Sequence, residues 1–150
     1  MENKTILKIR EFNRFYLSTM DFYEAKYLSS DYSMTESRVL YEIYETGKCN
    51  ADDVVKKLHL DKGYLSRIIK RFENKQILQR EKSQTDARFY HIQLTEKGKK
   101  ITEALIYESN QGIGNIIQSL STEECIQLEK SMDTIKKILT GGLNHENHKI

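Results

Sequence analysis

An aspartate and an arginine stand two residues apart, at Asp86 and Arg88, in a loop between two segments with strand character. The loop, SQTDAR, contains neither glycine nor proline, although hairpin turns usually depend on such residues. An arginine at a hairpin tip is a cation that the negative potential of a DNA minor groove would attract. The neighbouring acid could pair with it or cap the loop backbone. The alternative is an incidental surface ion pair, which contributes little.

A second group of polar side chains lies in the segment KGYLSRIIKRFENK, directly after Asp61. Its apolar residues recur at helical spacing and predict one buried stripe; they are Leu65, Ile68, Ile69 and Phe72. Polar residues around the rest of this helix are candidate DNA contacts, namely Lys62, Gly63, Tyr64, Ser66, Arg67, Lys70, Arg71 and Asn74. Arginine can bond to guanine, asparagine to adenine, and serine or lysine to phosphate. For a lone helix, an ordinary solvent-exposed face would be the better interpretation.

The charge distribution favours an anionic partner. Residues 56–88 hold ten basic and four acidic residues, a net charge of +6, whereas the whole chain carries only +2. The rest of the chain is therefore at −4, and the basic middle lies between acidic ends. A solvated, lysine-rich helix face is the alternative, so clustering alone favours nucleic acid only slightly.

The sequence does not indicate catalysis, a metal site or a cofactor. It has no nucleophile elbow, phosphate loop or carboxylate pair placed for chemistry. The four histidines, His59, His91, His145 and His148, do not have zinc-binding spacing. With 31% charged residues and apolar runs far too short for a membrane span, the chain is expected to be soluble.

Two cysteines, Cys49 and Cys125, make no disulfide framework, which predicts a cytoplasmic protein with reduced thiols. Both have helix-start neighbours that could lower the pKa of a thiol.

The elements that must position these residues are predicted from helix caps, because the chain has no proline. A stripe of apolar residues predicts a first helix over about residues 4–28. Five later helices are predicted to start after the capping residues Thr35, Asn50, Asp61, Thr95 and Ser121. Two strands are predicted at Ile77–Lys82 and Phe89–Leu94. Glycines predict a bend or break at Gly112 and Gly114 and an end of the last helix at Gly141.

Three short helices followed by a hairpin form a winged helix-turn-helix, and the turn before the third helix, residues 59–61, is as short as this motif requires. The fold class is therefore mainly α with a small β-hairpin wing. The helix after Asp61 takes the place of the recognition helix. The candidate DNA contacts of the wing are Lys82, Asp86 and Arg88.

The segment DKGYLSRIIKRFENKQILQREKSQTDARFYHIQLTEKGKK resembles the DNA-binding lobe of the MarR family of bacterial transcription regulators. The Asp86-Ala87-Arg88 wing is that family's hallmark, and Leu94–Gly98, LTEKG, matches as well. The likeness covers about residues 30–100 of the chain, which we expect to form a single domain at 1–150. The segments IREFNRFY and LDKGYLSRIIKRFE also resemble a subgroup in which this domain is fused to an acetyltransferase, but we do not expect that activity here. Gln76 departs from the family, which commonly has glycine in this left-handed position.

The resemblance implies a homodimer built from the terminal helices, about residues 4–28 and 100–140. Apolar residues cover much of the first helix, more than a monomer of this size could bury, although packing within one chain is the alternative. The resemblance also implies a small-molecule effector site, with candidate lining residues Phe12, Tyr16, Tyr23, Tyr41 and Tyr44. A role as core aromatics is the better interpretation of these five. Redox sensors of the family carry their cysteine in the first helix, where this chain has none.

Two functions compete. The first is a sequence-specific dimeric regulator of transcription, most often a repressor, which binds a palindrome in double-stranded DNA. The second is a winged helix that binds protein or non-specific nucleic acid. The wing arginine together with Arg67 and Lys70 favours the first, because an architectural module needs no base-reading side chains.

Overall fold

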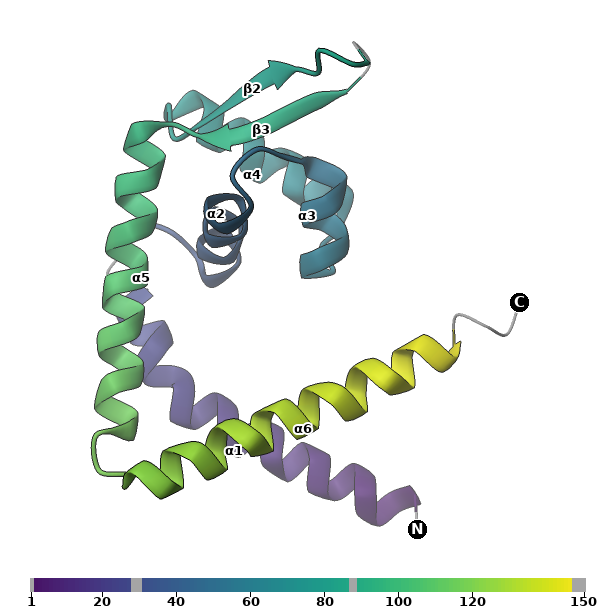
Figure 1. Ribbon diagram of the computed structural model, residues 1–150, viewed down its shortest axis with the longest axis vertical. Helices are drawn as coiled ribbons and strands as arrows, with labels where there is room; N and C mark the ends of the chain where they lie inside the picture. The colour runs from purple at the N-terminus through teal and green to yellow at the C-terminus, as the bar shows by residue number, and fades with distance from the viewer. Residues whose placement is uncertain (1, 28–30, 87–88, 147–150) are drawn as a thin grey trace. The chain divides into compact units, whose positions relative to one another are not determined.

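The computed structural model describes residues 2–27, 31–86 and 89–146 (Figure 1). In chain order the elements are α1 (Glu2–Tyr27), α2 (Met34–Thr46), β1 (Cys49–Asn50), α3 (Ala51–Leu58), α4 (Lys62–Asn74), β2 (Leu78–Lys82), β3 (Tyr90–Leu94), α5 (Glu96–Ile117) and α6 (Thr122–Glu146). The chain divides into two compact units, Met1–Gly112 and Ile113–Ile150. None of the described helices is long and apolar enough to cross a membrane.

The strands form a small antiparallel sheet in the order β1-β3-β2, and Figure 1 shows β2 and β3 as a hairpin beside α2, α3 and α4. The hairpin is in register over its whole length, from Leu78 opposite Leu94 to Lys82 opposite Tyr90. Both predicted strands are confirmed to within one residue at their starts. The third strand, β1, was not predicted, because a two-residue strand carries no alternation that a sequence pattern can register.

One apolar core holds the hairpin against the three short helices. The predicted stripe of α4 is buried as expected, with each of its four apolar side chains at most 4% exposed. It packs with residues of α2, α3 and the sheet, including Val39, Leu40, Ile43, Val54, Ile77, Leu78, Ile92 and Leu94. Burial of such a side chain contributes roughly 1.5–3 kcal/mol, so the helix cannot turn its opposite face inward without losing this core.

Most of the predicted helix starts are confirmed, and one is wrong. The Asp61 carboxylate accepts the Tyr64 backbone N–H at 2.8 Å, and Ser121 forms the expected capping box with Glu124. The helix α2 is capped by Ser33 rather than Thr35. Ser33 has the acid that completes a capping box three residues later, at Glu36, whereas the residue three positions after Thr35 is an arginine.

The expectations about glycine breaks are wrong. The helix α5 continues without a break through Gly112 and Gly114, and α6 continues past Gly141 to Glu146. Glycine permits a left-handed helix end but does not impose one, and its cost inside a helix is only about 1 kcal/mol. Both helices continue through these segments despite the glycines.

Candidate nucleic-acid interface

A tight turn sets the start of the recognition helix, α4. His59 ends α3 in the left-handed conformation, with φ of 51°, which reverses the chain within three residues. An ion pair between Lys62 and Asp52, at 2.9 Å, spans the turn from α4 to α3. The Asp61 cap holds the first turn of α4, and the exposed Lys62–Asp52 pair adds little to it.

Most of the predicted DNA contacts of α4 share the exposed face opposite the core. We call Gly63, Tyr64, Ser66, Arg67, Lys70 and Asn74 the polar face of α4, and all six are exposed. The guanidinium carbon of Arg67 lies 5.7 Å from the centre of the Tyr64 ring, within the range of a cation–π contact. The face presents two cations and an amide, which are groups that can bond to base edges and phosphates.

Arg71 was predicted as a DNA contact, and the structure places it in a different setting from its neighbours. Its guanidinium bonds to the Glu36 carboxylate, at 2.5 Å from Nη1 and 3.2 Å from Nη2, and to the backbone carbonyl of Asp31 at 3.2 Å. The Glu36 side chain is only 7% exposed. These contacts tie Arg71 to the start of α2 and give it a structural role, and its contact with DNA stays a prediction.

The hairpin tip is organised by Ser83, a residue whose role the sequence analysis missed. The Ser83 hydroxyl accepts the backbone N–H groups of Thr85 and Asp86, each at 3.3 Å, and bonds to the Thr85 hydroxyl. The backbone N–H of Phe89 donates to the Asp86 carbonyl at 3.0 Å. The signal was present, since serine at the start of a turn commonly bonds to the backbone two or three residues later. The loop can therefore do without glycine.

Of the predicted wing contacts, Lys82 is exposed at the end of β2 and Asp86 lies in the loop, partly buried. Arg88 lies outside the described residues. An ion pair between Arg80 of β2 and Glu73 of α4, at 2.9 Å, couples the wing to the recognition helix. This pair had not been foreseen, because it joins residues from different elements. The pair shows that β2 lies next to α4, while the shared apolar core holds the two elements together.

The base of the hairpin is joined to α5 by the residues of the LTEKG segment. The Thr95 hydroxyl donates to the carbonyls of Gln76 and Ile77, at 2.7 and 3.1 Å, and accepts the Gly98 backbone N–H at 3.1 Å. A Cβ atom at Gly98 would lie 2.1 Å from the Ile77 carbonyl oxygen, so only glycine fits. Gln76 itself is left-handed, with φ of 57°, as its place in the family pattern predicted.

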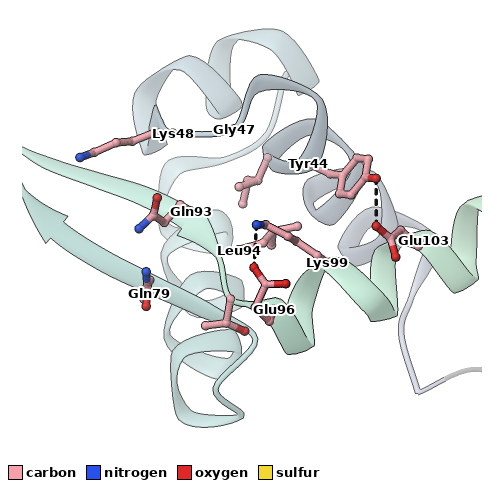
Figure 2. Close-up of a pocket in the computed structure, with 11 residues that line it drawn as sticks. Tyr44, Gly47, Lys48, Gln79, Gln93, Leu94, Glu96, Lys99 and Glu103 are labelled. Carbon is pink, nitrogen blue, oxygen red and sulfur yellow. Dashed lines mark hydrogen bonds and ion pairs between the residues drawn. The ribbon is translucent and has the colours of Figure 1, made fainter.

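A pocket of about 610 Å³ opens between the end of α2, the sheet and the start of α5 (Figure 2). Its wall includes Tyr44, whose hydroxyl bonds to the Glu103 carboxylate at 3.2 Å, and this contact raises the pKa of Tyr44. The other lining residues are Ile43, Gly47, Lys48, Gln79, Gln93, Leu94, Thr95, Glu96 and Lys99. The ammonium of Lys99 bonds to Glu96 at 2.8 Å, and Lys48 bonds to Glu81, so neighbouring carboxylates already neutralise both cations.

The candidate effector residues do not all line this pocket. Of the four whose side chains are described, Tyr44 lines it, while Tyr41 is exposed on α2 and Phe12 stacks on Tyr16 along α1 at 5.8 Å. For Tyr23 the backbone alone is described.

Cys49 differs from the expectation for a reactive thiol. It is buried in the core, and burial raises the pKa of its thiol, as do the nearby carboxylates of Asp53 and Glu42. The start of a helix lowers the pKa of a nearby thiol, but at Cys49 the effects that raise it are larger. Cys125 is partly buried in α6 and, like Cys49, forms no disulfide.

Comparison with known proteins agrees with this architecture. Residues 32–89 match the model of the MarR family. The regulator MhqR of Bacillus subtilis is 27% identical over 144 residues, which cover 96% of this chain and 95% of MhqR. A MarR family protein from Bacillus stearothermophilus superposes with a TM-score of 0.79 at 18% identity, over 93% of this chain and 99% of that one.

Streptococcus pneumoniae FabT, whose crystal structure was solved in complex with DNA, superposes with a TM-score of 0.78 at 22% identity, over 91% of this chain and 98% of FabT. The matched family segment contains the helix-turn-helix and β2 and ends just before β3. Residues 32–89 therefore carry the winged-helix segment of the MarR family of transcription regulators, and the fold of the chain matches a solved structure of that family.

Proposed function

We propose that this protein is a dimeric, sequence-specific DNA-binding repressor that acts on a palindromic operator. The observation that carries the proposal is the exposed polar face of α4, held beside the hairpin by the apolar core that the two share. A winged helix places such a face in the major groove and its hairpin over the adjacent minor groove. Arg67 and Asn74 are the side chains suited to base edges, and Lys70 is suited to phosphate.

Support for a dimer comes from apolar side chains that one chain leaves in contact with water. In α1, Ile6, Leu7, Ile9, Phe12, Phe15 and Leu17 are each 45–65% exposed. In α6, Ile126, Leu128, Ile135, Ile138 and Leu139 are 38–68% exposed. Surfaces of this kind usually mark an interface, and a two-fold partner would cover the same surface on both chains. Two-fold symmetry predicts half-sites about one helical turn apart.

The first test is binding to the DNA upstream of the protein's own coding region, followed by footprinting and selection of preferred sites from random duplexes. We expect a palindromic site, and we expect Arg67→Ala to relax the base preference at one position in each half-site, at a cost of ~1–3 kcal/mol per contact. Lys130→Ala, a change at an exposed lysine of α6, is the control and should leave the preference unchanged.

Equal affinity for all sequences would contradict sequence-specific regulation and would favour a winged-helix module that binds protein or nucleic acid without specificity. A loss in Arg67→Ala that is uniform over all sequences would make Arg67 a phosphate contact instead. We leave a small-molecule effector out of the proposal, because the candidate aromatic residues do not gather in one described pocket.

A further inference from the structure

The contact between Arg67 and Tyr64 sets the orientation of the Arg67 side chain, which matters for base recognition. The two residues lie one turn apart on the polar face, and the guanidinium carbon lies over the ring at 5.7 Å from its centre. A Cβ atom built at Gly63 would lie 3.9 Å from Nη1 of Arg67. The Arg67 side chain therefore leans back toward the start of α4, across the bare backbone of Gly63.

The start of α4 fixes the backbone from which the Tyr64 ring projects. The Tyr64 backbone N–H is held by the Asp61 carboxylate at 2.8 Å, in the first turn of the helix. The same carboxylate oxygen would lie 3.2 Å from a Cβ at Gly63, so the space beside the cap is already narrow. A Cβ at this position would be tight against the Asp61 cap and in ordinary van der Waals contact with the guanidinium.

A ring beneath a guanidinium restricts the plane of the cation and leaves its edge open. The N–H groups that bond to guanine lie along that edge, so stacking on one face does not compete with base contact. An arginine already held in one orientation loses less side-chain entropy when it binds. Exposed cation–π contacts of this kind correspond to about a two- to five-fold effect on an equilibrium.

We propose that Tyr64 is a positioning residue for base recognition, and that its ring orients the Arg67 guanidinium toward one base in each half-site. The inference rests on the proposed function, because it needs Arg67 to contact a base. It assigns to Tyr64 an effect on sequence preference rather than on overall affinity, since the tyrosine adds no charge.

The test uses the full-length protein and the variants Tyr64→Phe, Tyr64→Leu, Arg67→Ala and the double variant Tyr64→Leu/Arg67→Ala. Each is titrated against the selected site and its single-base variants at several salt concentrations. Tyr41→Leu, which changes an exposed tyrosine of α2, is the matched control. Urea unfolding of each variant confirms that it is folded; the Tyr64 residue is 37% exposed, so we expect little effect on stability.

We expect Tyr64→Leu to reduce the preference at the Arg67-dependent position by about two- to five-fold per half-site, with an unchanged slope of log K against log salt. Tyr64→Phe should retain the preference, because it keeps the ring. In the Arg67→Ala background, Tyr64→Leu should have no further effect.

Three results would overturn the inference while leaving the proposed function intact. The first is a wild-type preference in Tyr64→Leu. The second is an equal loss in Tyr64→Phe, which would mean that the hydroxyl contacts DNA. The third is an undiminished loss in the Arg67→Ala background, which would mean that the tyrosine acts on its own. A wild-type protein without any sequence preference would instead overturn the proposed function itself.

Discussion

Two arginines of the recognition helix, four positions apart, have different surroundings in the folded chain. Arg67 lies on the polar face and contacts only a neighbouring ring among its described partners. Arg71 reaches across to α2, where Glu36 and the Asp31 carbonyl hold its guanidinium. A helical wheel cannot separate them, because both fall near the polar side. The difference depends on a carboxylate that lies 35 residues earlier in the chain.

The first prediction concerns this ion pair. Arg71→Ala should lower the free energy of unfolding by roughly 1–3 kcal/mol, because it leaves the Glu36 carboxylate, which is only 7% exposed, without its cation. Lys70→Ala, at an exposed position of the same helix, should change it by less than about 0.5 kcal/mol. Urea unfolding followed by circular dichroism measures both. Equal stability of the two variants would show that Arg71 has no structural role.

At the scale of elements, sequence patterns predicted the helices and strands that depend on neighbouring residues, but not the contacts between distant segments. Asp61 and Ser121 were identified as caps because a cap bonds within its own first turn. The stripe of α4 and the two hairpin strands followed from periodicity. The strand β1, the Arg80–Glu73 pair and the setting of Arg71 depend on contacts between distant segments, which one sequence does not encode as a pattern. Gly141 shows the reverse error, a local signal that the helix around it overrides.

The junction between the hairpin and α5 shows how a short segment can fix three elements. Thr95 bonds to the carbonyls at the start of the hairpin, and Lys97 donates to the Lys75 carbonyl at the end of α4, at 2.8 Å. The close approach of Gly98 to Ile77 brings α5 directly against the base of the wing. The direction of the wing relative to α4 therefore depends on a residue that has no side chain.

The second prediction tests this junction. Gly98→Ala should destabilise the fold by about 1–3 kcal/mol, because the added Cβ would overlap the Ile77 carbonyl oxygen, which belongs to the backbone and cannot move alone. Gly114→Ala, in the same helix but with no atom within 4 Å of the new Cβ, should be neutral or stabilising. Thermal unfolding of the two variants provides the comparison. If Gly98→Ala were as stable as Gly114→Ala, the close contact would not hold in solution.

At the scale of the whole molecule, the exposed apolar residues of α1 and α6 motivate a prediction about assembly. The third prediction is a full-length dimer at micromolar concentration, which deletion of residues 121–150 should convert to monomers or aggregates. Leu139→Glu is a more local test, because its side chain is 60% exposed in one chain and a charge there would matter only in an interface.

Sedimentation velocity distinguishes these cases. Lys130→Glu, which changes a charge on the face of α6 opposite Leu128, Ile135 and Leu139, should remain dimeric. A full-length monomer, or a Leu139→Glu variant that dimerises as tightly as the wild type, would contradict assembly through α6.

The last prediction concerns the two wings that a dimer would present to one operator. If Arg88 enters the minor groove, Arg88→Ala should weaken DNA binding and leave the fold and the dimer intact, because the hydrogen bonds of Ser83 organise the described part of the hairpin tip. The substitution removes one cation from each of the two wings, so the magnitude of the slope of log K against log salt should fall by roughly 2. The loss should be larger at operators that are A·T-rich under the wing, where a narrow groove concentrates negative potential.

The matched variants separate charge from geometry. Asp86→Ala should weaken binding less than Arg88→Ala, because it leaves the cation in place, and Arg88→Lys should restore part of the affinity, because lysine keeps the charge but loses the planar fork. Salt titrations of the wild type and the three variants on one operator measure all of these effects. Wild-type binding by Arg88→Ala at every salt concentration would mean that the hairpin is not a DNA wing. The net charge of +6 over residues 56–88 would then require a different anionic partner.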